Sequence, residues 1–204
     1  MKIYTSLFPP IKGEIGKQSE INKESCDKCE HLLNTNRYKK IEYVFDDWNG
    51  EDLIKGVSCL IVSQRLKERI ISEEMKGFSF KEIIVSKGDY FKTKKGAYQV
   101  GLPKFYEIQI EGRAKGPEGW FIKLSECSYC KNTKWKVSPL GRKSMVKSHR
   151  SNEAIPRAVY KNTWNSDDIF KLEDPGDPIF TERFLNILID LKVKNFDYKE
   201  AQWV

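Results

Sequence analysis

The sequence predicts an α+β protein: two related small α/β repeats joined by an antiparallel β-meander and held together by a four-cysteine site. Three observations predict this fold, namely two similar segments far apart in the chain, strand patterns between them, and two CxxC motifs. The chain has 204 residues, of which 39 % are hydrophobic and 12 % aromatic. It is therefore long enough to bury a sizeable core.

Two segments share the same features in the same order, which indicates an internal repeat. Each has a Trp-Asn pair, an Asp, a short apolar run, a hydroxyl residue, an Arg, and a closing aromatic-x-aromatic-Lys-Glu pattern. The offset between the segments is 116 residues at the tryptophans and 118 from the apolar run onward. The corresponding residues are Trp48 and Trp164, Asp52 and Asp168, Ser63 and Thr181, and Arg65 and Arg183.

The order of features predicts the elements of each repeat. An asparagine, Asn49 or Asn165, would cap a short element, and the apolar run that follows is a strand. The hydroxyl residue stands where the N-cap of a helix is expected. Each helix would end in a left-handed cap, at Gly77 or at residues 194–195. A short aromatic strand then closes the repeat.

Acidic pairs at residues 46–47 and 167–168 could in principle hold a hard cation. Asp168, however, recurs in the first repeat as Asp52. A recurring residue is better explained by the fold that both copies share. We therefore expect both residues to serve as caps or as ion-pair partners of the arginine that follows in each repeat.

Between the repeats we expect an antiparallel meander. Glycines separate strand-like stretches, and a knuckle flanked by two strands is typical of zinc-ribbon hairpins. The expected strands are residues 98–100, 106–111, 120–124 and 134–137, followed by a polar, basic connector at 138–156. The chain divides into residues 1–86, with the first CxxC motif and the first repeat at about 42–86, then 87–150 with the second motif, then 151–204 with the second repeat. We expect the three parts to form one compact unit.

Four of the five cysteines form two CxxC pairs, Cys26 with Cys29 and Cys127 with Cys130. A CxxC turn directs two sulfur atoms at one metal ion, and two turns complete a tetrahedron, so we predict one structural Zn²⁺. The 97 residues between the pairs mean that the site would tie the N-terminal segment to the middle of the chain. Disulfides, separate thiols and a thioredoxin-like motif are the alternatives. Cys59 is expected as a buried apolar residue.

The CxxC pairs and two further patterns resemble the bacterial double-CxxCG-motif immunity proteins, which accompany swarming-inhibition toxins of myxobacteria. The patterns are Trp-Asn-Ser-Asp-Asp-Ile-Phe from Trp164 and Phe-Thr-Glu-Arg-Phe from Phe180. The C-terminal part is also similar to immunity families with a Trp-x-Gly-x-Asp-Ile-Phe pattern. The resemblance covers residues 24–200. It departs after each CxxC pair, where Glu30 and Lys131 replace the family's glycine.

The resemblance implies a cytoplasmic protein that is not an enzyme and that neutralises a cognate bacterial toxin. The motifs agree with this, because no nucleophile elbow, P-loop or His-Glu-x-x-His is present. Both histidines, His31 and His149, stand in polar surroundings and are expected in solvent. No apolar stretch approaches the roughly 18 residues of a membrane span, so no membrane partner is expected. A toxin domain is the expected partner, and the resemblance does not say which residues contact it.

The formal charge of +7 is unevenly distributed. Residues 1–86 are neutral (14 basic and 14 acidic), residues 87–150 carry +10 (15 and 5), and residues 151–204 carry −3 (7 and 10). Basic side chains interleaved with aromatic ones can bind phosphates and stack on bases. The alternative function is therefore a zinc-ribbon protein that binds nucleic acid through residues 87–150. Lysine outnumbers arginine there, which favours a solvated face instead.

Overall fold

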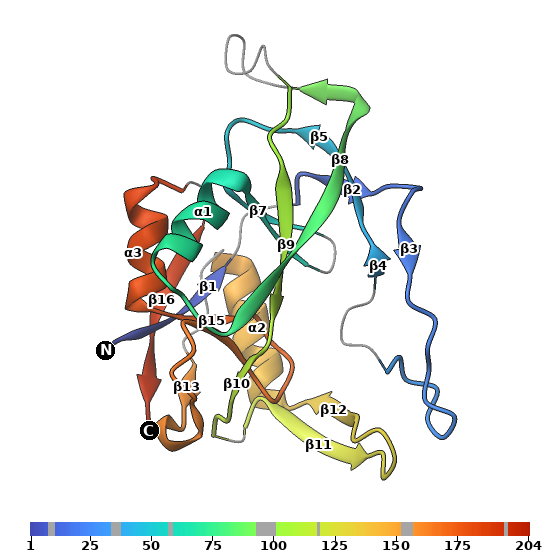
Figure 1. Ribbon diagram of the computed structural model, residues 1–204. Coiled ribbons are helices and arrows are strands. Elements are labelled where there is room, and N and C mark those ends of the chain that lie inside the picture. Colours follow the sequence, from blue (N-terminus) through green and yellow to red (C-terminus); the bar gives the residue numbers. More distant parts are fainter. Residues whose placement is uncertain are drawn as a thin grey trace.

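The computed structural model describes residues 1–7, 11–33, 38–56, 59–92, 101–117, 119–151, 157–193 and 196–204. Within these residues the protein is mostly β-sheet with a few helices, in agreement with the expected α+β class (Figure 1). Two six-stranded sheets contain most of the strands, and two two-stranded ribbons accompany them. None of the helices in the described part is both long and apolar enough to cross a membrane.

The first six-stranded sheet is built from strands between residues 13 and 110. Its one parallel pair is β5 with β8, and the other neighbours are antiparallel. β8 is longer than the short strand expected at residues 78–80, because its first part pairs with β9 and its second part with β5. It therefore continues across the boundary expected at residue 86. In order across the sheet, the strands are β2 (Gly13–Ile15), β5 (Glu42–Asp47), β8 (Phe78–Lys92), β9 (Phe105–Ile110), β7 (Leu60–Ser63) and β6 (Leu53–Lys55).

The second six-stranded sheet is built mainly from the C-terminal residues. The N-terminal strand β1 is an exception, because it lies inside this sheet and pairs antiparallel with both β15 and β16. A short 3-10 helix, η1 (Lys161–Thr163), follows the edge strand β13. In order across the sheet, the strands are β10 (Gly112–Ala114), β14 (Ile169–Leu172), β15 (Ile179–Thr181), β1 (Ile3–Leu7), β16 (Asp197–Trp203) and β13 (Ala158–Val159).

Two helices follow strand pairs of the same kind. β6 and β7 pair antiparallel and lead into α1 (Gln64–Ser72), and β14 and β15 pair antiparallel and lead into α3 (Glu182–Asp190). The N-caps are those predicted from the sequence. The side-chain oxygen of Ser63 accepts a hydrogen bond from Leu66 N at 3.2 Å, and that of Thr181 accepts one from Phe184 N at 3.5 Å. The hydroxyl residue therefore fixes the start of each helix.

The ends of these helices differ from the expectation. The left-handed residues are Glu74 (φ 51) and Lys192 (φ 54), which lie before the expected positions. Gly77 also has a positive φ (97), but it lies beyond the helix end, where it allows close packing: a Cβ there would lie 2.3 Å from the carbonyl oxygen of Ile169. The other expected cap, residues 194–195, lies outside the described residues. Both helices therefore end in a left-handed turn without using glycine.

The expectation that Asn49 and Asn165 cap a short element is wrong, because no helix begins at either residue. Instead, the tryptophan before each asparagine closes a tight turn. The indole N–H of Trp48, and likewise that of Trp164, donates to the backbone carbonyl three residues further on, at 2.9 Å. The asparagine is thus a turn residue, and the indole makes the side-chain hydrogen bond that the two segments share.

Three apolar clusters form the core. The first lies between α1 and α3 and includes residues from both six-stranded sheets, so it joins the two halves of the protein. The second packs on the first sheet, and the third on the second sheet. Fully buried members of the three clusters include, in turn, Leu66, Ile70 and Leu188, then Tyr43, Phe45 and Phe105, then Ile3, Phe170 and Ile179.

The middle of the chain does not form one meander. β9 joins the first sheet between β8 and β7, whereas β10 joins the second sheet and pairs parallel with β14. β11 (Phe121–Glu126) and β12 (Thr133–Val137) form a separate antiparallel hairpin, as expected for the strands around the second CxxC motif. The connector expected at 138–156 is instead a helix, α2 (Pro139–Ser151). The strand expected at residues 98–100 lies outside the described residues.

Candidate metal centre

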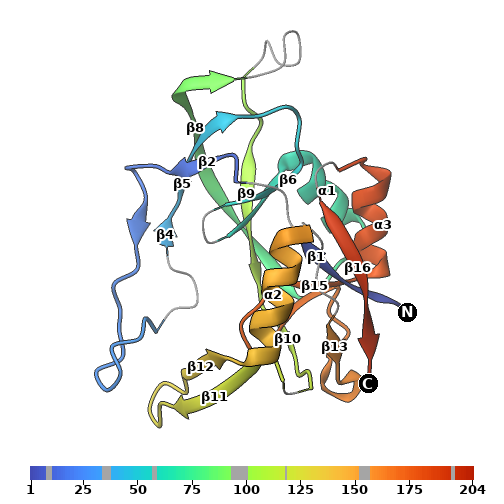
Figure 2. The same cartoon turned by 180° about the vertical axis from the view of Figure 1, so that it is seen from behind.

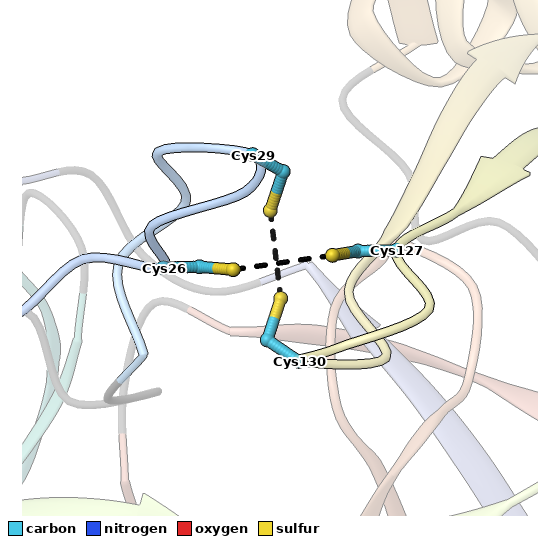
Figure 3. Close-up of side chains that lie close together, drawn as sticks. All are labelled: Cys26, Cys29, Cys127 and Cys130. Carbon is cyan, nitrogen blue, oxygen red and sulfur yellow. Dashed lines mark hydrogen bonds between the residues drawn. The ribbon is translucent and has the colours of Figure 1, made fainter.

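The two CxxC motifs lie at the tips of two projections that leave different sheets. Cys26 and Cys29 belong to the arm, defined here as residues 20–33, which follows β2 of the first sheet and begins with β3 (Glu20–Ile21). β3 pairs with β4 (Tyr38–Lys40). Cys127 and Cys130 lie in the turn of the hairpin, residues 121–137, which follows β10 of the second sheet. Figure 3 shows the four sulfur atoms pointing toward one another from these two tips.

The spacing of the sulfur atoms suits one tetrahedral metal ion. Cys26 Sγ and Cys127 Sγ are 3.9 Å apart, Cys29 Sγ and Cys130 Sγ are 3.5 Å apart, and all four lie within 4.8 Å of one another. A metal–sulfur distance of about 2.3 Å gives a tetrahedron with sulfur–sulfur edges of about 3.8 Å. A disulfide would need about 2.05 Å, so the cysteines are not joined by disulfide bonds. The structure therefore brings together the four cysteines predicted from the sequence, and they form a group that could hold a metal ion.

The same backbone turn presents each pair of sulfur atoms. In the first motif, Cys26 N donates to the carbonyl of His31 and Glu30 N donates to the carbonyl of Cys26, both at 2.8 Å. In the second motif, Cys127 N and Lys131 N make the equivalent hydrogen bonds at 2.8 and 2.9 Å. An antiparallel bridge between Ser25 and Leu32 flanks the first turn, and the strands of the hairpin flank the second. Each turn is thus built locally, and only their meeting depends on the rest of the fold.

The residue after each second cysteine has a left-handed backbone. Glu30 has φ 58 and Lys131 has φ 59, values that L-residues other than glycine adopt at a cost in free energy. These are the two positions where the resembling family has glycine. The structure shows why glycine suits them, because the chain must reverse there to bring both sulfur atoms to one side of the turn. Glu30 and Lys131 adopt this conformation although both have a Cβ.

The surroundings of the sulfur atoms shift the pKa values of the thiols in opposite directions. Backbone N–H groups of Cys130 and Tyr129 point at Cys127 and lower the pKa of its thiol to about 6. The N–H of His31 acts in the same direction on Cys29, but burial and the neighbouring sulfur atoms outweigh it and raise its pKa to about 12. Four thiolates repel one another at these distances unless a cation lies among them. A bound metal ion would supply that charge and deprotonate all four.

The other candidate ligands lie apart from this cluster. The side chain of His31 is exposed and outside the group of ligands, whereas Cys26, within the group, is only 1 % exposed. Cys59, expected to be buried, is half-buried and packs against the second apolar cluster. Within the described residues, the four cysteines are the only group of three or more His, Cys, Asp or Glu placed to hold a metal ion. The acidic pair at 167–168 accordingly forms no such site.

Asp52 and Asp168 make the structural contacts predicted for them. Asp168 Oδ1 accepts a hydrogen bond from Thr181 Oγ1 at 2.9 Å, and Arg183 reaches the same carboxylate at 3.2 Å. Asp52 Oδ1 accepts one from Ser63 Oγ at 2.5 Å and pairs with Arg65. The buried carboxylate therefore links the N-cap hydroxyl to an arginine on the first helical turn. Sequence reasoning found these partners because they recur at the same spacing.

Each arginine also crosses to the other helix, which the sequence did not indicate. The guanidinium of Arg183 donates to the backbone carbonyl of Glu73, the C-cap residue of α1, at 2.8 Å. The guanidinium of Arg65 donates to the carbonyl of Leu191 at the end of α3, at 3.4 Å. Cations at the C-terminus of a helix interact favourably with its free carbonyl groups. The start of each helix is thus connected to the end of the other.

No protein-family model matches the chain, and a search of curated proteins finds no match either. The likeness to double-CxxCG-motif immunity proteins therefore depends on the quoted motifs alone. What the structure adds independently is the geometry of the four cysteines and the contacts around each helix start.

Proposed function

We propose that the protein is an immunity protein that binds and neutralises a cognate bacterial polymorphic or contact-dependent toxin by stoichiometric inhibition. It would act in the cytoplasm, without catalysing a reaction. Such a function requires a rigid scaffold with a complementary surface and no set of catalytic groups. The motifs that resemble immunity proteins lead to this proposal, and the properties of the four-cysteine cluster support it.

The observation that carries the proposal is the closed character of the cluster. A catalytic metal site keeps one coordination position open for water or substrate, whereas a structural site is filled by four protein ligands. Here four thiols point toward one another and lie within 4.8 Å of one another, which provides all four ligands of such a site. A metal ion bound there would join the arm to the hairpin and would have no position left for a substrate. This supports a role in shaping a binding surface.

We propose Zn²⁺ as the metal. Soft thiolate ligands in tetrahedral arrangement are typical of structural zinc, and Cys26, Cys29, Cys127 and Cys130 would provide all four. When bound, the ion would supply a cross-link between two projections of different sheets. The chain's own contribution is the pair of backbone turns, each of which directs two sulfur atoms at the same point.

We also propose that the two helix-containing units are copies of one duplicated unit. Support comes from the same strand–strand–helix–strand order in both, and from N-caps, left-handed helix ends and crossing arginines that all lie 118 residues apart. Such a correspondence in hydrogen bonds goes beyond similar secondary structure.

A test of the proposed function is co-expression of this chain with the toxin encoded by the adjacent gene. We expect the chain to restore growth, to co-purify with the toxin, and to abolish toxin activity at an equivalence point of one chain per toxin domain. Normal toxin activity in the presence of excess chain would refute the proposal. Binding of RNA or DNA at physiological salt, without a toxin partner, would favour the alternative of a nucleic-acid-binding protein.

A further inference from the structure

The positive charge of the protein resides in the hairpin and α2. Residues 119–151 have eight basic side chains and one acidic one, a net charge of +7. The remaining residues have 28 of each sign (36 − 8 and 29 − 1), so this unit accounts for the whole formal charge. Its one acidic residue, Glu126, pairs with Lys123 at 2.5 Å. Four thiolates with Zn²⁺ would add net negative charge only at the tip, which leaves the strands and the helix basic.

One face of the hairpin is both basic and apolar. Phe121 is buried, whereas the next residue, Ile122, is 48 % exposed. Ile122 lies directly opposite Lys136 in the strand register, so the two side chains share a face of the ribbon. Lys134 and Lys136 are exposed on either side of the half-buried Trp135, so Lys134 lies on this face too. The outer face therefore combines an isoleucine with two lysines.

The helix α2 is fixed to the base of this hairpin. Gly141 N donates to Ser138 Oγ at 3.0 Å, which caps the helix. A Cβ at Gly141 would lie 2.3 Å from the carbonyl oxygen of Trp120, so the first turn of the helix packs against the backbone at the start of β11. Figure 2 shows α2 rising from the end of β12, away from the hairpin tip. The hairpin and the helix thus form one unit with a defined shape.

The exposed side of α2 repeats the chemistry of the hairpin face. Residues 142, 143, 146, 147 and 150 are exposed and share one side of the helix, because they are three or four positions apart. All are basic except Val146, which is 45 % exposed. Lys143 lies four residues before Lys147, and like charges at this spacing disfavour an isolated helix. A negatively charged partner would remove this repulsion.

The exposed aliphatic side chains of the hairpin and α2 favour a protein partner over a nucleic acid. Single-stranded nucleic acids bind to exposed aromatic rings on which bases stack. On the strands of this unit, Phe121 is buried and Trp135 half-buried, and the guanidinium of Arg157 covers the ring of Trp120 at 4.7 Å. The one exposed ring among the described residues of the unit, Tyr129, lies in the CxxC turn at the tip, where Lys28 of the arm lies over it at 5.8 Å. Ile122 and Val146 are exposed instead. Apolar side chains within a charged rim are typical of protein–protein interfaces.

We propose that an acidic protein docks on a basic surface formed by Ile122, Lys134 and Lys136 of the hairpin with Lys143, Val146 and Arg150 of α2. The inference rests on the proposed function, in which this partner is the toxin. The lysines and the arginine would attract and orient an acidic toxin surface and raise the association rate. The two aliphatic side chains would be buried by it and would slow dissociation.

The test compares two variants of equal net charge. Lys136→Glu/Lys143→Glu reverses two charges on the proposed surface, and Lys17→Glu/Lys161→Glu reverses two exposed lysines outside it. A third variant, Ile122→Thr/Val146→Thr, removes the apolar contacts. Affinity for an inactive form of the toxin encoded by the adjacent gene is measured by surface plasmon resonance at two salt concentrations. Metal content and thermal unfolding verify that every variant is folded.

We expect the surface charge variant to bind at least about tenfold more weakly, mainly through slower association, and the control to bind like the wild type. The apolar variant should dissociate about tenfold faster. If the wild type binds the toxin and both charge variants bind equally well, the docking surface is refuted while the proposed function stands. If the wild type does not bind the toxin, the proposed function and the docking surface are both refuted. Binding of labelled RNA or DNA that only the surface charge variant loses would also overturn the inference.

Discussion

Glu30 and Lys131 are placed where the chain reverses direction behind each pair of sulfur atoms. A left-handed backbone costs a residue with a Cβ about 1–2 kcal/mol. Glycine avoids this cost, but it loses more conformational entropy on folding, so the net gain from a substitution by glycine is smaller. The turn has to close before both sulfur atoms can reach one ion. The cost is therefore incurred when the metal binds.

Replacing Lys131 by glycine should tighten metal binding. Relief of about 0.5–1 kcal/mol corresponds to an affinity about two- to fivefold higher, measured by competition with a chromophoric chelator. Glu30→Gly should have the same effect at the other turn. Ser128→Gly is the control, because the φ of Ser128 is not positive. Equal affinity gains in Ser128→Gly and Lys131→Gly would show that backbone strain is not the cause.

The second residue-scale prediction concerns Asp168, whose side chain is 3 % exposed while that of its partner Arg183 is 51 % exposed. Asp168→Ala should destabilise the fold by about 3 kcal/mol, because Thr181 Oγ1 and Lys76 N both lose their acceptor. Arg183→Ala should cost about 1 kcal/mol or less, since solvent screens an exposed guanidinium. Urea unfolding measures both. Asp190→Ala, at an exposed site, should change the stability by less than about 0.5 kcal/mol.

At the scale of elements, β9 is a central strand with an acidic residue inside it. Glu107 is 9 % exposed and accepts a hydrogen bond from Gln109 Nε2 at 3.0 Å. Burial raises the pKa of Glu107 above the ordinary value of 4.5 and outweighs the nearby Lys81 and Lys171. A carboxyl whose folded pKa is raised favours the fold below its ordinary pKa, and this contribution is lost as the pH rises through the folded value.

Glu107→Gln should therefore gain stability relative to the wild type as the pH rises above 4.5, because the amide carries no charge to bury. The difference between the two free energies of unfolding, measured by urea titration across this pH range, should grow and then level off. Glu82→Gln, at an exposed site on β8, is the control and should show no such growth. A difference independent of pH would contradict the assignment to Glu107.

Elements set by local chemistry could be predicted from the sequence, and those set by distant contacts could not. Ser63 and Thr181 were identified as caps because a hydroxyl three residues before a free N–H acts within one turn. β10 has only three residues, and its place beside β14 depends on Gly112, where a Cβ would lie 2.7 Å from Ile169 O. α2 was missed because Pro139 and Gly141 suggest a loop and its apolar residues are few. Its cap at Ser138 was the available signal.

For the whole molecule, the metal centre matters because it joins tips that leave different sheets. The cysteines could be identified from sequence, since CxxC spacing encodes a local turn and thiols of two such turns suit one ion. That the turns meet across 101 residues follows from the tertiary fold. The arm and the hairpin contribute no residue to the three apolar clusters. A bound metal ion would thus fix the arm to the hairpin, which the apolar core does not do.

Loss of the metal should loosen both tips and leave the sheets folded. In Cys127→Ser, amide hydrogen exchange should accelerate in residues 20–33 and 121–137, while β1, β9 and β15 keep their protection. Mass spectrometry of the exchanged protein measures this. Cys59→Ser, outside the cluster, should exchange like the wild type. Global unfolding of Cys127→Ser would instead show that the site is part of the folding core.

The central claim, one metal ion bound by the four cysteines, is tested most directly by native mass spectrometry of the chain purified without added metal. We expect the mass of one chain plus one zinc ion, retained in Cys59→Ser and lost in Cys26→Ser and Cys127→Ser. A metal-free wild-type chain with four reduced thiols, or one lighter by two disulfide bonds, would contradict the account.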